Sequence, residues 1–246
     1  MIELDDEGLI RLQKLLAQSG VASRRKCEEL MLEGQVEVDG EIVTRLGTKV
    51  DPTKAVIRVA GKRLPPISPH VYLVLNKPRG VVSTMSDPEG RRSLGDLVAH
   101  RPERLFHVGR LDTDTDGLIV LTNDGDFAHK MAHPSFEVEK TYVAEVQGVP
   151  TRATLQRLRD TVVLEDGPVT VTSVRIKQRL GEKAIVELVI HEGRNRIVRR
   201  LLEHVGHPVV RLSRTRFGPV AIGRLRRGEM RELDSSELGA LLDSIG

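Results

Sequence analysis

The chain has 246 residues, 39% hydrophobic and 30% charged, a composition typical of folded globular proteins and not of disordered ones. No apolar run approaches the roughly 18 residues of a membrane span, and the acidic start lacks the basic and apolar stretches of a secretory signal. The single cysteine, Cys27, cannot form an internal disulfide, so a reducing cytoplasm is the expected location. One cysteine also disfavours a structural zinc module.

The first segment of the chain reads as two short helices followed by a small sheet. Leucines at helical spacing over residues 9–16 predict the first helix. Ser23 is expected to cap the second helix and Gly34 to end it. Alternating residues on both sides of Asp39 and Gly40 predict a hairpin with a tight turn.

This order of elements resembles the small RNA-binding module of ribosomal protein S-four. The resemblance covers RLQKLLAQSGVASRRKCEELMLEGQVEVDGEIV, nearly the whole segment. A basic triplet alone is more often solvated surface, so a role in RNA contact rests on the resemblance. The side chains that it implies to face RNA are Arg11, Lys14, Arg24, Arg25 and Lys26.

Three prolines within residues 64–70 predict a semi-rigid linker. The domains expected are 1–63, the linker at 64–70, and 71–246. Strand-like segments dominate after the linker, and helices are expected at 124–131, 151–159 and 195–204. Because most strands follow one another without regular βαβ units, we expect an α+β domain with a mixed, mostly antiparallel central sheet.

The C-terminal part of the chain is rich in arginine. Between Ile190 and Arg231 there are 11 arginines, no lysine and three glutamates, which gives a net charge of +8. Guanidinium groups bind phosphate bidentately and stack on bases, so the segment favours nucleic-acid contact. With aromatic residues at 2%, a stacking platform for bases is not expected. The arginines expected to face RNA from this helix and the strand after it are Arg196, Arg199, Arg200, Arg211, Arg214 and Arg216.

Three aspartates within five positions, Asp112, Asp114 and Asp116, suggest an acidic metal loop or a polar turn before a strand. A calcium loop needs a later glutamate, which the apolar segment after Leu118 does not provide. The segment GRLDTDTDGL matches the signature of pseudouridine synthases, which is GRLD, two variable residues, Thr, one residue, then Gly-Leu. The matched residues are Gly109, Arg110, Leu111, Asp112, Thr115, Gly117 and Leu118.

Other segments resemble the same family. They include LNKPRGVVST from Leu75, Lys-Thr-Tyr at 140–142 and EGRNRIVRRLLEHVGHPVVRLSRTRFGPV from Glu192. The last resembles the subgroup that comprises small-subunit synthase A and large-subunit synthases B, E and F. Within this subgroup, the motif sequences are most similar to those of the B branch. The resemblance implies isomerisation of a uridine in ribosomal RNA, with 23S RNA as the expected target, 16S RNA as the alternative, and no cofactor or metal.

The resemblance also implies roles for individual residues. Asp112 is the expected catalytic carboxylate, acting on the sugar as a nucleophile or through a glycal. Tyr142 is expected to stack on the flipped uracil. Arg194 is expected to pair with Asp112, since a nearby cation favours the ionised carboxylate. Arg110 would fill the vacated space in the RNA stack or organise the loop, and Leu212 would pack under the base.

Two other classes of function compete with the enzyme. One is a non-catalytic RNA-binding factor in ribosome assembly, and the other is a magnesium-dependent nuclease that uses the aspartates. Asp112, Tyr142 and Arg194 together favour the enzyme, because a binder needs no such set. The expected partner is ribosomal RNA or a pre-ribosomal particle. The protein is expected to be a monomer and not to bind a membrane.

Overall fold

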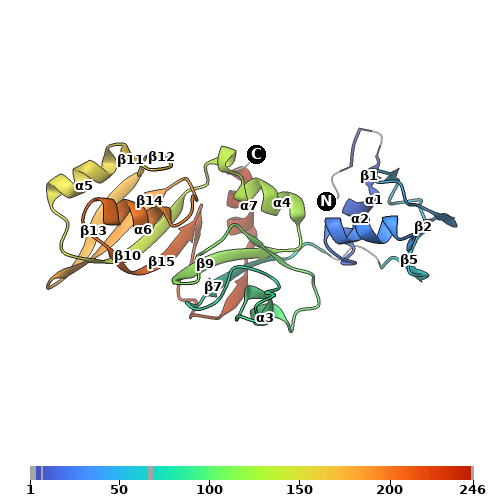
Figure 1. The fold of residues 1–246 in the computed structure, drawn as a ribbon, viewed down its shortest axis with the longest axis horizontal. Coiled ribbons are helices and arrows are strands. Elements are labelled where there is room, and N and C mark those ends of the chain that lie inside the picture. The colour runs from blue at the N-terminus through green and yellow to red at the C-terminus, as the bar shows by residue number, and fades with distance from the viewer. Residues whose placement is uncertain (1–3, 7, 66–68, 245–246) are drawn as a thin grey trace. The chain divides into compact units, whose positions relative to one another are not determined.

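The computed structural model describes residues 4–6, 8–65 and 69–244 (Figure 1). The chain divides into two compact units, Met1–His70 and Val71–Gly246. Three residues of the expected linker, 66–68, lie outside the described part. Within that part, no helix has the length and apolar character needed to cross a membrane.

The first unit packs two helices on small antiparallel sheets. Its helices are α1 (Leu12–Gln18) and α2 (Arg24–Leu32). Its strands are β1 (Ile10–Arg11), β2 (Val36–Val38), β3 (Glu41–Ile42), β4 (Lys49–Val50), β5 (Ile57–Val59) and β6 (Lys62–Arg63). The pairing orders are β1-β4 and β3-β2-β5-β6. Leu12, Leu16, Cys27 and Met31 are fully buried between the helices and strands and form the core of this unit.

The local signals read from the sequence account for these elements. The Ser23 side chain accepts a hydrogen bond from the backbone N–H of Lys26 and caps α2 at 3.1 Å. Asp39 and Gly40 have φ values of 52° and 91°, as the tight hairpin turn requires. The first helix starts three residues later than predicted, because Ile10 and Arg11 pair with β4.

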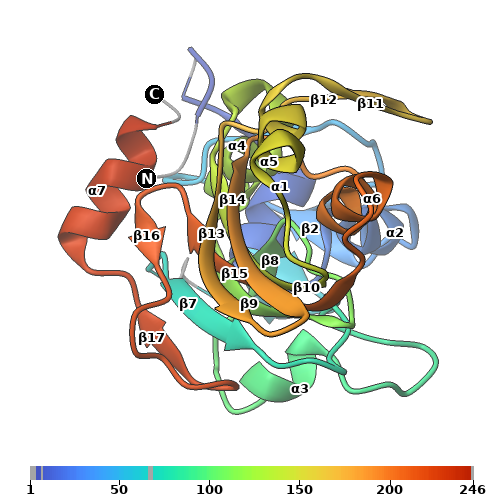
Figure 2. The same cartoon turned by 90° about the vertical axis from the view of Figure 1, so that its left-hand side faces the viewer.

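The second unit is built on a nine-stranded sheet that curves strongly (Figure 2). Its main order is β13-β14-β10-β15-β9-β7-β17, with β8 paired to β9 and β16 to β15. Only β15 and β9 run parallel among these described pairs, so the expected mixed, mostly antiparallel sheet is confirmed. The strands are β7 (Tyr72–Lys77), β8 (Phe106–Val108), β9 (Thr115–Thr122), β10 (Lys140–Gln147), β13 (Ser173–Leu180), β14 (Lys183–Ile190), β15 (Val209–Phe217), β16 (Val220–Ala221) and β17 (Met230–Glu232). A separate hairpin consists of β11 (Val162–Leu164) and β12 (Gly167–Val169).

The helices of this unit cover both faces of the sheet. They are α3 (Leu94–Val98), α4 (Gly125–Ala132), α5 (Arg152–Arg159), α6 (Ile197–His204) and α7 (Ser235–Asp243), with a 3₁₀ turn η1 at Pro134–Phe136. Of the three predicted, α4 and α5 are confirmed with Asp124 and Thr151 as caps. The third, α6, begins two residues later, because Arg196 has a left-handed φ of 49°.

Strand β9 lies at the centre of the unit, and all eight of its residues are buried. Ile119 and Leu121 join the core cluster that also holds the apolar side of α6. Leu118 and Val120 join the opposite cluster, which is covered by α4 and α7. A strand covered on both faces needs a continuous apolar run, which explains the sequence LIVL. The loop that precedes this strand therefore starts from a rigid support.

Candidate active site

A cleft of about 800 Å³ lies in the second unit. Asp112, Tyr142 and Arg194, which are far apart in the sequence, all line it. Four further predicted residues line it as well: Arg110, Arg196, Leu212 and Arg214. The walls come from the loop before β9, from β10 and β15, and from the segment that leads into α6. One cavity therefore brings together the side chains that the motifs singled out.

The loop that carries Asp112 is held by hydrogen bonds to the segment after β7. The Ser83 hydroxyl donates to the carbonyl of Leu111 at 2.6 Å and accepts from its N–H at 3.1 Å. The N–H of Gly80 donates to the carbonyl of Thr113 at 2.7 Å, and that of Thr115 donates to the carbonyl of Asp112 at 3.0 Å. Within the described residues, the carboxylate of Asp112 makes no hydrogen bond or ion pair, so it is available to a ligand in the cleft.

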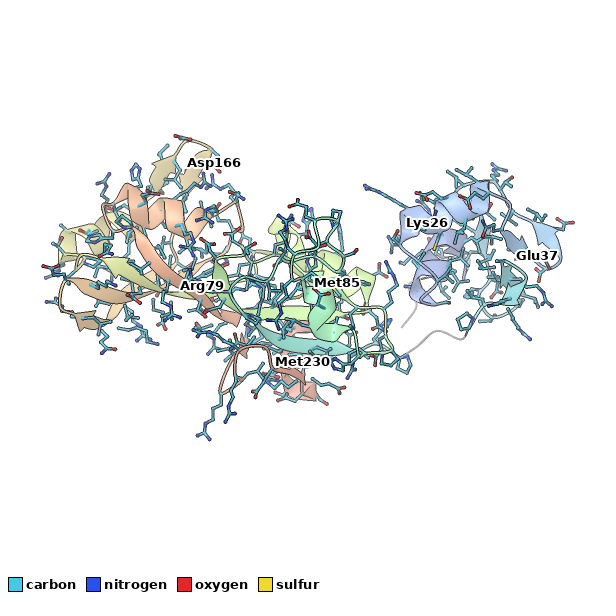
Figure 3. All side chains as sticks on the ribbon, turned by 60° about the horizontal axis from the view of Figure 1, so that its bottom comes forward. Lys26, Glu37, Arg79, Met85, Asp166 and Met230 are labelled. Carbon is cyan, nitrogen blue, oxygen red and sulfur yellow. The ribbon has the colours of Figure 1, made fainter. Side chains whose placement is uncertain are left out.

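The expected ion pair between Arg194 and Asp112 is wrong. The Arg194 guanidinium binds Asp166 on the β11–β12 hairpin, at 3.1 Å to its carboxylate and 2.8 Å to its carbonyl. Figure 3 labels Asp166 on this hairpin. It also donates to the carbonyl of Pro168 at 2.6 Å and to the carboxylate of Glu192. These four acceptors take up four of the five N–H groups of the side chain. Arg194 thus joins the hairpin to the cleft wall instead of neutralising Asp112.

Arginines of α6 and its N-cap supply the positive charge near Asp112. Arg196 bonds both carboxylate oxygens of Asp114, at 3.0 and 3.1 Å. Arg199, 9% exposed, donates to the carbonyl of Asp114 at 2.9 Å. Burial acts to raise the pKa of Asp114, but the bond from Arg196 and the charge of Arg199 outweigh it and lower that pKa. Both guanidinium groups also interact electrostatically with Asp112.

Comparisons with known proteins agree with this arrangement. The family model for RNA pseudouridylate synthase matches residues 71–204, more than half of the chain. The chain belongs to the RNA pseudouridylate synthase family. A model for the S4 domain, an RNA-binding module, matches residues 10–56.

Several relatives of this pseudouridine synthase match along nearly their whole length. An uncharacterized RNA pseudouridine synthase of Mycobacterium tuberculosis is 51% identical over 240 residues, 96% of this chain and 94% of the relative. Ribosomal large subunit pseudouridine synthase B of Bacillus subtilis is 44% identical over 233 residues, 94% and 95% of the two chains. A crystal structure of a pseudouridylate synthase, 29% identical, has a TM-score of 0.64 and covers 94% of this chain and 99% of that one.

The synthase buries a lysine at the end of β7, within electrostatic reach of the loop that carries Asp112. Lys77 has no exposed surface and donates to the carbonyls of Pro78 at 3.0 Å and Val81 at 2.8 Å. Burial lowers its pKa to about 8, although the charges of Asp116 and Asp112 oppose this shift. In the sequence, Lys77 stands out only as part of the LNKPRG motif, which does not indicate that its ammonium is buried.

The buried lysine predicts a pH dependence of stability. Its pKa is about 8 in the folded state and near 10.4 unfolded, so between these values the unfolded chain binds more protons and stability rises with pH. We expect the free energy of unfolding to gain on the order of 2 kcal/mol from this group between pH 7.5 and pH 9.5. Urea denaturation of the wild type and Lys77→Met measures it. An equal rise in both proteins would show that Lys77 is not its source.

The three aspartates of the motif do not form a common site. Asp114 pairs with Arg196, and Asp116, 4% exposed, is bound by Arg227 at 3.0 Å. Among the described residues, no three histidine, cysteine or acidic side chains are grouped as a metal site requires. Two of the three carboxylates are therefore held by arginines, and Asp112 alone faces the cleft unpaired.

The predicted RNA-facing residues fall into two groups. Arg199 and Arg214 are buried, with Arg214 only 3% exposed, so their expected exposure on an RNA-facing surface is wrong. Arg200 is half-buried and binds Asp166 at 2.8 Å. The side chains that are exposed are Arg11, Arg24, Arg25, Lys26, Arg110, Arg196, Arg211 and Arg216, and Lys14 is half-buried.

Proposed function

We propose that this synthase converts one uridine of 23S ribosomal RNA to pseudouridine, with Asp112 as the catalytic carboxylate. The observation that carries the proposal is the unpaired Asp112 carboxylate in a cleft that also contains Tyr142. The target class is supported by the relative of Bacillus subtilis, which is named for the large ribosomal subunit. The enzyme works on RNA in the cytoplasm as a monomer, on free ribosomal RNA or on a pre-ribosomal particle.

The reaction needs the target base outside its stack, which costs a few kcal/mol. Exposed basic residues of α2 and arginines around the cleft offset this cost through phosphate contacts. Asp112 then acts at the sugar, as a nucleophile at C1′ or as a base at C2′, while the C1′–N1 bond breaks. Tyr142 and Leu212 enclose the base as it turns and rejoins through C5. Arg196 and Arg199 provide the positive field for Asp112, and Arg194 holds the hairpin in place.

The target is tested by mapping pseudouridines across ribosomal RNA in cells with and without this gene. We expect one site in 23S RNA to disappear and to return with the wild-type gene but not with Asp112→Asn. If every site in 23S and 16S RNA persists, the proposal is wrong. Loss of a 16S site instead would reject the large-subunit target.

A further inference from the structure

Two cations flank one aromatic ring inside the cleft. The guanidinium carbon of Arg214 lies 5.2 Å from the centre of the Phe217 ring, and the ammonium of Lys140 lies 5.9 Å from it. All three residues line the cleft. The ring faces contribute modestly to holding the cations. Two positive charges that share a ring repel each other, so a further reason for their placement is needed.

Arg214 is buried without a carboxylate partner. Its Nε donates to the carbonyl of Leu118 at 2.8 Å. Its Nη2 is closed to solvent and has no hydrogen-bond partner, and within the described residues Arg214 forms no ion pair. A buried, unpaired charge costs several kcal/mol, and an unsatisfied buried donor adds to this cost. Such a group fits a site that is completed only when a negatively charged acceptor enters the cleft.

Lys140 completes the same cluster from β10. Its ammonium donates to the carbonyl of His191 at 2.5 Å. Burial and the charge of Arg214 lower its pKa to about 8, and the carboxylate of Glu192 partly opposes them. Near neutral pH the ammonium is therefore still mostly charged, and it adds to the positive potential at this end of the cleft.

The position of Arg214 in the sheet places this charge beside the proposed base pocket. Arg214 on β15 lies directly opposite Tyr142 on β10, and Leu212 lies opposite Ala144. Side chains two apart on a strand share a face, so Arg214 and Leu212 face the same side as Tyr142. The cations therefore adjoin the residues proposed to enclose the uracil.

The reaction creates a negative charge on that base. When the C1′–N1 bond breaks, its electron pair goes to N1 of uracil, and the charge spreads to O2 and O4. This holds whether Asp112 adds to C1′ or removes the C2′ proton. The charge is quenched when C5 attacks C1′, which displaces the Asp112 carboxylate from an adduct or, in the glycal route, is accompanied by return of the proton from Asp112 to C2′. C5 then loses its proton and N1 gains one. Preorganised donors aimed at a developing charge are a large source of rate acceleration.

Resting on the function proposed above, we propose that Arg214, assisted by Lys140, stabilises the uracil anion during the rearrangement. A contact with an RNA phosphate is the competing interpretation. The burial of Arg214, which is 3% exposed, favours a contact with the base over one with a phosphate. The backbone of a flipped nucleotide stays near the exposed rim of the cleft, where Arg110 and Arg196 lie. Arg214 and Lys140 thus join Asp112 as catalytic residues, a role that their sequence motifs did not predict.

The test uses single-turnover kinetics on an RNA hairpin that carries the uridine found by the mapping experiment. Arg214→Gln is expected to lower the rate about 10²- to 10³-fold, as the loss of one preorganised donor does elsewhere. Arg179→Gln, the same change at an exposed position of the edge strand β13, is the matched control and is expected to keep the wild-type rate. Thermal unfolding checks the fold of each variant.

A second substrate separates anion stabilisation from a structural role. The same hairpin with 5-fluorouridine at the target has a better leaving base, because fluorine withdraws electrons. Its C5 carries no proton to lose, so its rate is followed as the loss of 5-fluorouridine, which reports C1′–N1 cleavage and not pseudouridine formation. Its rate loss in Arg214→Gln is expected to be smaller than that of the uridine hairpin by about tenfold. Lys140→Met is expected to show the same pattern without a change in β15. Arg214→Lys keeps a cation and replaces Arg214→Gln in this test if Arg214→Gln does not fold. On the uridine hairpin it is expected to lose less rate than Lys140→Met.

Equal losses on both hairpins would overturn the proposal. So would weaker RNA binding with a salt slope reduced by about one and an unchanged single-turnover rate, because this would identify a phosphate contact. If the wild type fails to convert the hairpin, the proposed function itself fails, and the inference falls with it. Wild-type conversion with unaltered Arg214→Gln kinetics rejects the inference alone.

Discussion

Replacing Asp112 by asparagine is expected to lower the single-turnover rate by at least about 10⁴-fold while RNA binding persists. The amide keeps the shape of the side chain but is neither a nucleophile nor a base at the sugar. Because the carboxylate has no partner among the described residues, its loss leaves no group unsatisfied. The rate is measured by the pseudouridine formed in a ribosomal RNA hairpin, and the affinity by filter binding.

The control for this variant is Asp243→Asn, which makes the same chemical change at an exposed position of α7 outside the cleft. It is expected to keep wild-type activity, and both variants are expected to unfold within a few degrees of the wild type. Activity retained by Asp112→Asn would remove this residue from the mechanism. A wild type that binds ribosomal RNA but forms no pseudouridine in any fragment would instead favour a non-catalytic binder.

The motifs predicted which side chains meet in the cleft, but the roles of Arg194 and Arg199 were predicted wrongly, for physical reasons that lie in the tertiary structure. Arg194 was expected to pair with Asp112 because it follows Gly193 in the family motif. The β11–β12 hairpin instead supplies Asp166 and Pro168 as acceptors for its guanidinium. Arg199 and Arg200 flank the apolar stripe of α6 on opposite sides, so helical periodicity gives them similar exposure. The nearby loop then covers Arg199, whose guanidinium binds the carbonyl of Asp114.

The face of β15 was also misjudged. A regular strand would place Arg214 and Arg216 together, and the arginines from 211 onward were expected to share one exposed face. The pairing with β10 is irregular between Thr141 and Tyr142, where one step on β10 matches two on β15. Such a bulge changes the direction in which the neighbouring side chains point, and the hydrophobic periodicity of the sequence does not reveal it. Arg214 consequently enters the cleft while Arg216 stays exposed. Arg211, an odd number of positions from Arg214, is exposed on the other face of the strand.

Two helices were not predicted although their caps are readable. Ser93 and Asp96 form a reciprocal capping box at the start of α3, and Asp234 and Glu237 form another at the start of α7. Both have the spacing of a capping residue followed three positions later by an acid. The five residues of α3 are too few to show a helical period, and α7 buries only Leu241, so periodicity alone does not reveal either helix.

Gly117→Ala is expected to be the most destabilising single change in the motif. Gly117 has a φ of 115°, which side chains rarely adopt, and an added Cβ would lie 2.3 Å from the backbone oxygen of Arg214. The clash is with backbone on the neighbouring strand, so it cannot be relieved by turning a side chain. The β9–β15 pair would have to separate, at a cost of about 3 kcal/mol or more.

Urea denaturation of Gly117→Ala measures this cost, with Gly239→Ala in α7 as the matched control. An added Cβ at Gly239 meets nothing within 4 Å. Alanine loses less backbone entropy than glycine when the helix forms, so this variant is expected to be more stable by about 0.5–1 kcal/mol. Because Arg214 also bonds the carbonyl of Leu118, separation of these strands would displace its guanidinium from the cleft, and any folded Gly117→Ala should turn over poorly. Wild-type stability and rate in this variant would mean that β9 and β15 are not packed as closely as their register requires, and that the glycine of the motif serves some purpose other than this close approach.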